Sequence, residues 1–182
     1  MEKIKDRQYL GGIAGLVGGL CMVIVDRISY SMGLSKRLYA ETSAGVWVGS
    51  KRQAKSRSGH VLGAIMTLAL AMMGGAVKVS ILTKYGRDKI IPKGLMFGIS
   101  FGAIITGLTN GFAMNKVKPK DANSNLSHVA ASGIYGMVTA FLISKLGDDS
   151  LFDAKPQNDY IKPTIPTTEE KKPQNVIGQA AK

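Results

Sequence analysis

The chain has 182 residues, of which 45% are hydrophobic, and it carries 24 Lys and Arg against 12 Asp and Glu. The single cysteine, Cys21, excludes an intramolecular disulfide and a CxxC metal or redox motif. The basic residues flank apolar segments and no basic run carries interleaved aromatic residues, so we expect no nucleic-acid partner. The apolar residues are gathered into four long blocks with almost no charge, which excludes a standard soluble fold.

The four apolar blocks predict four membrane-spanning helices. An α-helix needs about 20 apolar residues to cross the hydrocarbon core of a bilayer, and within lipid a helix satisfies its own backbone hydrogen bonds. The first two blocks reach that length if Asp26 and Lys78 lie at their ends and extend toward the headgroups. The sequence therefore predicts an all-α integral membrane protein, with a four-transmembrane-helix bundle over residues 1–146 and spans at about 9–27, 60–82, 94–115 and 126–146.

The N-terminus has some features of a signal peptide, because Lys3, Lys5 and Arg7 precede the first apolar run. No A-x-A cleavage site follows, and the run ends in Asp26 and Arg27. We therefore interpret it as an uncleaved first span.

The long first loop, residues 26–59, carries seven Lys and Arg. Its centre, residues 38–49, is too short and too polar to span a bilayer. Because Tyr39 and Trp47 have rings that favour the membrane–water interface, we expect this segment to lie there. Residues 123–127 (NSNLS) are expected to cap the fourth span.

Residues 147–182 contain four of the six prolines, mixed charge and few large apolar side chains. This composition predicts a disordered C-terminal tail. The tail could be a flexible tether, a partner-binding segment or inert.

Four spans place both termini on the same side of the membrane. The numbers of Lys and Arg on the two sides are nearly equal, so the positive-inside rule barely separates the two orientations. The N-terminal charges and the compact second hairpin lie close to their spans, which favours cytoplasmic termini.

Glycines recur at intervals of four in the first and third spans, which places them on one face of each helix. Such bare faces let helix backbones approach closely in lipid. They could form an oligomer interface or pack inside one bundle. The predicted helix-packing glycines are Gly11, Gly15, Gly19, Gly94, Gly98, Gly102, Gly107 and Gly111.

Polar residues within the spans should face one another or water rather than lipid. In the fourth span they recur at steps of 4, 3 and 4 and form one continuous stripe from His128 to Thr139. The candidate polar intramembrane residues are Asp26, His60, Lys78, Asn110, His128, Ser132, Tyr135 and Thr139.

Connectivity places Asp26, His60 and His128 on the same side of the membrane and at similar depth. If they converge, a carboxylate and two imidazoles could relay protons or hold a divalent metal. In the alternative interpretation each histidine lies at an interfacial helix start, and Asp26 pairs with Arg27 or a lipid headgroup.

Motifs for catalysis are missing from the sequence. There are two histidines, no HExxH, no G-x-S-x-G and no glycine-rich phosphate loop after a strand. We therefore expect no enzymatic activity, no metal and no cofactor.

Several short segments occur in an order that is similar to that of a known group of membrane proteins. Residues 25–35 (VDRISYSMGLS) follow a glycine-rich first span, Gly59-His60 opens the second, residues 92–98 (PKGLMFG) open the third, and Ser127-His128 marks the fourth. Together they resemble small uncharacterised four-span membrane proteins of spore-forming, Firmicutes-type bacteria. The resemblance covers roughly residues 9–147 and implies a bacterial plasma-membrane location, without implying an activity.

Two functions fit these features. The first is a structural, assembly or partner-binding role in the membrane, with a dry interior and with a homo-oligomer or another membrane protein as partner. The alternative is a small oligomeric permeation or transport unit for an ion or small solute. That alternative predicts water along the stripe from His128 to Thr139.

Overall fold

The computed structural model describes residues 3–113, 116–119 and 121–152. The predicted disordered tail falls largely on residues 153–182, which lie outside the described residues. The long helices are α1 (Arg7–Ser31), α4 (Arg57–Tyr85), α5 (Ile90–Phe112) and α6 (Ala122–Leu146), and the short ones are α2 (Tyr39–Trp47), α3 (Lys51–Ala54) and the 3-10 helix η1 (Asp149–Phe152). The four long helices are each long and apolar enough to cross a membrane, which confirms the predicted all-α four-span architecture.

Local capping sets several of the helix boundaries. The side chains of Asp6, Ser56 and Asp121 accept hydrogen bonds from the first turns of α1, α4 and α6. The expectation that residues 123–127 cap the fourth span is therefore wrong, because Asp121 provides the cap and those residues lie inside α6. Gly86 ends α4 with a φ of 76°, a conformation that glycine adopts without steric cost.

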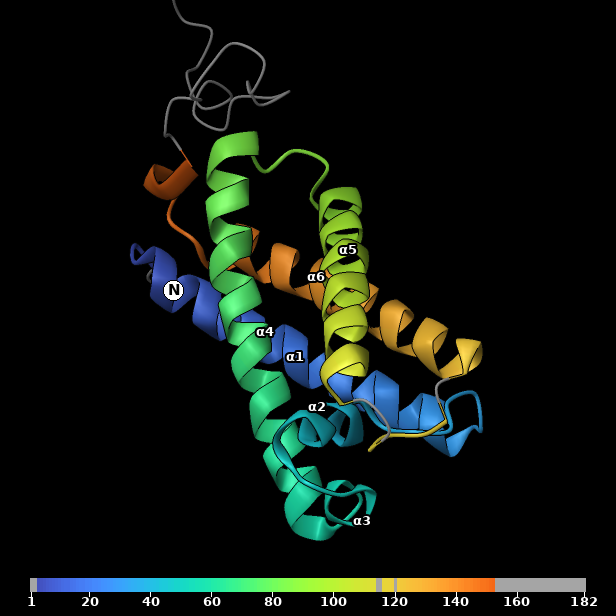
Figure 1. Ribbon diagram of the computed structural model, residues 1–182. Coiled ribbons are helices and arrows are strands. Elements are labelled where there is room, and N and C mark those ends of the chain that lie inside the picture. Colours follow the sequence, from blue (N-terminus) through green and yellow to red (C-terminus); the bar gives the residue numbers. More distant parts are fainter. Residues whose placement is uncertain (1–2, 114–115, 120, 153–182) are drawn as a thin grey trace, which may run out of the picture.

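The long helices form two crossed layers (Figure 1). In this view α4 and α5 run in front, and α1 and α6 cross behind them. α1 packs against both α4 and α6, and α5 packs against α6. The short helix α2 packs against α4 and α5 near one end of the bundle.

Two helix crossings are built from glycines in backbone contact. In the α1–α4 crossing, a Cβ atom on Gly11 would lie 2.5 Å from the Cα atom of Ala76. In the α5–α6 crossing, a Cβ atom on Gly98 would lie 2.9 Å from the Cα atom of Gly136. Such approach gives extensive van der Waals contact, which is what holds helices together in lipid. The interpretation that these glycines pack inside one bundle is therefore confirmed.

The predicted glycine faces pack over only part of their length. Gly15 and Gly19 contact α4, and Gly94 and Gly102 contact α6. A Cβ atom on Gly107 or Gly111 would meet no atom of the described residues within 4 Å. The prediction of packing within the chain is therefore wrong for these last two, because the step of five residues from Gly102 to Gly107 turns them onto the exposed face of α5, whereas Thr106 stays on the buried face.

The two ends of the described chain lie side by side. The Ile4 N–H donates to the Leu146 carbonyl at 2.9 Å, and the Asp148 N–H donates to the Ile4 carbonyl at 3.0 Å. Phe152 joins a buried apolar cluster with Leu10. The ordered bundle therefore extends past Leu146, and the predicted boundary of the tail at residue 147 lies too early.

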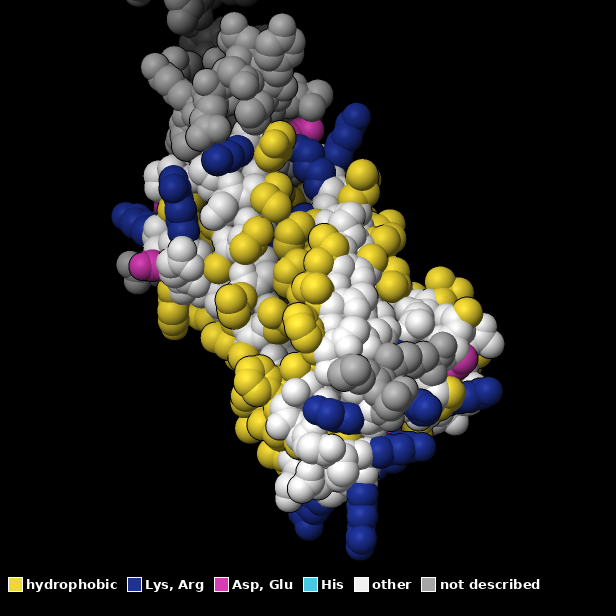
Figure 2. Space-filling view, viewed as in Figure 1, with side chains coloured by type: hydrophobic (Ala, Val, Ile, Leu, Met, Phe, Trp, Pro, Cys, Tyr) yellow, Lys and Arg dark blue, Asp and Glu magenta, His cyan; other side chains and the backbone are white. Residues whose placement is uncertain are grey.

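The outer surface suits a bilayer. Hydrophobic side chains gather over α4 and α5, and Lys and Arg side chains project at both ends of the molecule (Figure 2). Exposed apolar side chains on α4 include Val61, Ile65 and Met73, and on α5 Met96 and Ile104. In water such a surface would be unfavourable, whereas lipid chains cover it without cost.

Gly75→Ala tests the glycine crossings. A Cβ atom there would lie 2.8 Å from the Cα atom of Gly15, so the two backbones would have to separate. We expect Gly75→Ala to lower the free energy of unfolding by about 1–3 kcal/mol, as measured by SDS-induced unfolding of the protein in mixed micelles. Gly107→Ala is the matched control, and equal losses in the two variants would contradict the packing role.

Candidate functional site

The candidate site is a buried polar network around α2. Tyr39 and the run from Glu41 to Gly45 are buried, and the side chain of Trp47 is 65% exposed. Most of the segment is therefore packed into the bundle rather than exposed on its surface, and its position at the membrane–water interface stays a prediction. Small residues explain the insertion, because at Gly63 of α4 a Cβ atom would lie 3.1 Å from the Cα atom of Ala40.

Asp26 of α1 caps α2 from a different helix. The side chain is buried, and its Oδ2 accepts a hydrogen bond of 2.7 Å from the backbone N–H of Tyr39, the first residue of α2. Leu38, at the N-cap position of α2, has no side-chain oxygen to do this. A carboxylate beside a helix N-terminus also interacts favourably with the helix dipole. The expectation that Asp26 extends to the headgroups or pairs with Arg27 is wrong.

His128 meets Asp26, as one interpretation of the sequence predicted. Its Nε2 lies 3.4 Å from Asp26 Oδ1 and 3.4 Å from the Arg37 carbonyl oxygen. The Tyr39 ring packs against the imidazole at a centroid distance of 4.8 Å. His128 is 1% exposed, so the alternative of an interfacial histidine is wrong for this residue.

His60 does not join Asp26 and His128. Its Nε2 lies 3.3 Å from Glu41 Oε1, and its Nδ1 contacts the Ser56 carbonyl. Among the described residues, no three His, Cys, Asp or Glu side chains are grouped so that they could hold a metal ion. The predicted three-residue cluster is therefore wrong, because α2 inserts Glu41 as the partner of His60.

Arg37 is the largest fully buried side chain and sequence reasoning missed it. Its Nη1 donates to the Pro119 carbonyl at 3.0 Å, and its Nη2 donates to Asn125 Oδ1. The predicted polar residue Asn110 also donates to Asn125 Oδ1, at 3.2 Å. Burial lowers the pKa of Arg37 below its ordinary value, and the charge of Asp121 opposes the shift. In the sequence Arg37 is one of seven basic residues in its loop, and no local signal separates it from the others.

The polar stripe of α6 is buried, as predicted. Its side chains bond within the bundle: Tyr135 Oη donates to the Ala71 carbonyl at 2.7 Å, and Ser132 Oγ donates to the His128 carbonyl at 2.9 Å. Thr139 packs beside Gly18 of α1. The stripe therefore faces the other helices rather than lipid.

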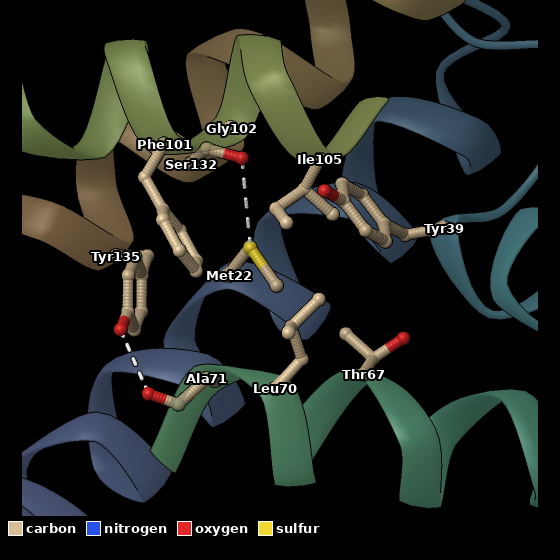
Figure 3. A pocket seen from close by; sticks show the side chains of 10 residues that line it. All are labelled: Met22, Tyr39, Thr67, Leu70, Ala71, Phe101, Gly102, Ile105, Ser132 and Tyr135. Atoms are coloured by element: carbon tan, nitrogen blue, oxygen red, sulfur yellow. Dashed lines mark hydrogen bonds between the residues drawn. The ribbon is translucent and has the colours of Figure 1, made fainter. Parts of the chain in front are cut away.

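A small cavity lies beside this stripe (Figure 3). Met22 and Tyr39 enter it from α1 and α2, Phe101 and Ile105 hang from α5, and Tyr135 lies at one end. The space open to the centre of a water molecule is about 20 Å³, which is enough for about one water.

Lys78 lies apart from this network. Its side chain is 1% exposed, its Nζ donates to the Lys93 carbonyl at 2.7 Å, and it lies 4.5 Å from the centre of the Phe97 ring. The expectation that Lys78 extends toward the headgroups is therefore wrong. A carbonyl and an aromatic face on α5 partner the ammonium group inside the bundle.

Searches of protein-family models, curated proteins and solved structures return no match to this chain. The resemblance to four-span proteins of spore-forming bacteria stays a prediction.

Asp26→Ala tests the cap on α2. The variant leaves the buried N–H of Tyr39 without an acceptor, so we expect it to lower the free energy of unfolding by about 1–3 kcal/mol. Asp26→Asn keeps an acceptor oxygen and should cost less. Unfolding in SDS and amide hydrogen exchange at the start of α2 measure both effects. If the two variants lose equal stability, the capping role is contradicted.

Arg37→Gln tests the link between the first and third loops. The shorter side chain cannot reach both the Pro119 carbonyl and Asn125, and each buried group that loses its partner costs about 1–3 kcal/mol. We expect a clear drop in unfolding free energy in the same SDS assay. Lys36→Gln is the matched control, since that side chain is exposed. Equal stability of the two variants would contradict a structural role for Arg37.

Proposed function

We propose that this protein is a non-conducting multi-pass membrane protein with a structural, assembly or partner-binding role. The observation that carries the proposal is the burial of the polar stripe from His128 to Thr139. Within that stripe the hydroxyl groups of Ser132 and Tyr135 donate to carbonyls of the same bundle, so these two are not left to line a water-filled path.

The cavity beside the stripe supports the same conclusion. A path for an ion or small solute needs a continuous column of water or a series of polar binding sites. The cavity has room for about one water, and Phe101, Ile105 and Leu70 supply much of its wall. Permeation through a single copy is therefore the weaker candidate.

The exposed surface supports a role in contact with other membrane components. Large apolar side chains on α4 and α5 are available to lipid or to a partner helix, and Gly107 and Gly111 leave a bare face on α5. Our proposal places the protein in a bacterial plasma membrane with both termini in the cytoplasm.

Cysteine labelling tests the proposed dry interior. In a Cys21→Ala background, single cysteines replace Ser132 and Thr139, which are near in size to cysteine. Intact cells and inverted vesicles are treated with a membrane-impermeant maleimide. We expect no labelling at either position until SDS unfolds the protein, because no water reaches the stripe. Labelling of both cysteines in the folded protein would overturn the proposal in favour of permeation.

Two control cysteines complete this experiment. Phe141→Cys lies on a partly exposed apolar face of α6 and reports labelling from within lipid. Ser50→Cys lies in the exposed first loop and should react readily. If the termini are cytoplasmic, Ser50→Cys is labelled in intact cells. Labelling of Ser50→Cys only in inverted vesicles would show that the termini lie outside the cytoplasm. That result would not affect the proposal of a dry interior.

A further inference from the structure

A cleft opens between the C-terminal end of α1 and the N-terminal end of α4. Its walls include Arg27 and Tyr30 from α1, and Lys55, Arg57 and His60 from the chain around the start of α4. Its volume is about 510 Å³. It is separate from the buried stripe of α6 and contributes nothing to the function proposed above.

The accessible charge in the cleft is positive. Arg27 and Arg57 are exposed, and neither forms an ion pair within the described part of the chain. The carboxylate in the cleft belongs to Glu41, whose side chain is only 6% exposed. It is engaged from two sides, by His60 Nε2 at 3.3 Å and by Lys55 Nζ at 4.0 Å. Glu41 thus holds the side chains of Lys55 and His60 at the base of the cleft. The guanidinium groups of Arg27 and Arg57 stay free for a ligand.

The cleft lies at the depth of lipid headgroups. On α4 the exposed apolar side chains Val61 and Ile65 begin one turn after Arg57, and on α1 the exposed Ile24 and Ile28 lie on either side of Arg27. Arg57 therefore stands where the lipid-facing apolar surface of α4 begins, and Arg27 lies in the last turns of α1. Tyr30, at the same level, has an amphipathic ring of the kind that settles at the interface.

We propose that this cleft binds the phosphate group of an anionic phospholipid. Guanidinium groups form paired, charge-assisted hydrogen bonds with phosphate oxygens, and two of them on adjacent helices can hold one phosphate from two directions. The glycerol and acyl chains of the same lipid would then continue along the apolar surface of α1 and α4. The Tyr30 hydroxyl adds a donor for a remaining headgroup oxygen.

The test is native mass spectrometry of the full chain released from nanodiscs of phosphatidylcholine with a minor fraction of phosphatidylglycerol. We expect the wild-type chain to retain phosphatidylglycerol in excess of its share of the bilayer. The double variant Arg27→Gln/Arg57→Gln should lose that enrichment by on the order of tenfold for each arginine removed, since a charge-assisted hydrogen bond to phosphate contributes roughly a factor of ten.

The matched control is Lys51→Gln/Arg52→Gln on α3. It removes the same number of charges from the same loop, but those side chains do not line the cleft. If the control loses as much enrichment as the cleft variant, the attraction is diffuse and the proposed site is overturned. Unchanged retention in the cleft variant overturns it too. Within the described residues neither the Arg27 nor the Arg57 side chain forms a hydrogen bond or ion pair with the bundle, so SDS unfolding should show both double variants to be folded.

A titration with inorganic phosphate tests whether the bound phosphate group belongs to a lipid or to a soluble ligand. The phosphate is titrated into the chain in nanodiscs of phosphatidylcholine alone and followed by calorimetry. Absence of binding there, together with retained phosphatidylglycerol, supports the lipid. Binding that disappears in the cleft variant supports the phosphate site but assigns it to a soluble ligand, which overturns the lipid. None of these outcomes depends on whether the interior of the bundle is dry.

Discussion

Backbone contact at two glycine-lined crossings is the constraint on which the rest of this structure depends. Gly11 and Gly15 of α1 meet α4, and Gly94 and Gly98 of α5 meet α6, in each case without side chains between the backbones. Lipid provides no hydrophobic force between apolar helices, so close packing has to supply the attraction. These contacts fix which helices are neighbours and bring polar residues on different helices to the same depth.

The buried polar network follows from that arrangement. With α1 and α6 held together, Asp26 and His128 face each other, and Asp26 also accepts the first N–H of α2. Arg37 then joins the same region to Pro119 and Asn125. In a low-dielectric interior each of these groups would be costly alone, and each is acceptable because another element supplies its partner. The network therefore stabilises the insertion of α2 into the bundle.

The two ends of the bundle differ in whether their basic side chains are paired with carboxylates. At the end that carries the described termini, Asp149 pairs with Lys3 and Arg87, and Asp88 pairs with Lys93. At the opposite end Arg27 and Arg57 flank an open cleft without carboxylate partners in the described region. Surface cations that are not neutralised by the protein are the ones available to anionic groups in the membrane.

Sequence alone determined the four spans, the glycine faces from Gly11 to Gly19 and from Gly94 to Gly102, and the polar stripe of α6 that turns away from lipid, because segment length, charge and helical period are local properties. It did not determine the partners of Asp26, Lys78 and His60, because a charged residue near the end of a span can turn outward to headgroups or inward to a partner. That choice depends on what the neighbouring helices present at the same depth. Only the tertiary structure supplied those partners: the inserted α2 brings the Tyr39 N–H to Asp26 and Glu41 to His60, and α5 brings the Lys93 carbonyl to Lys78.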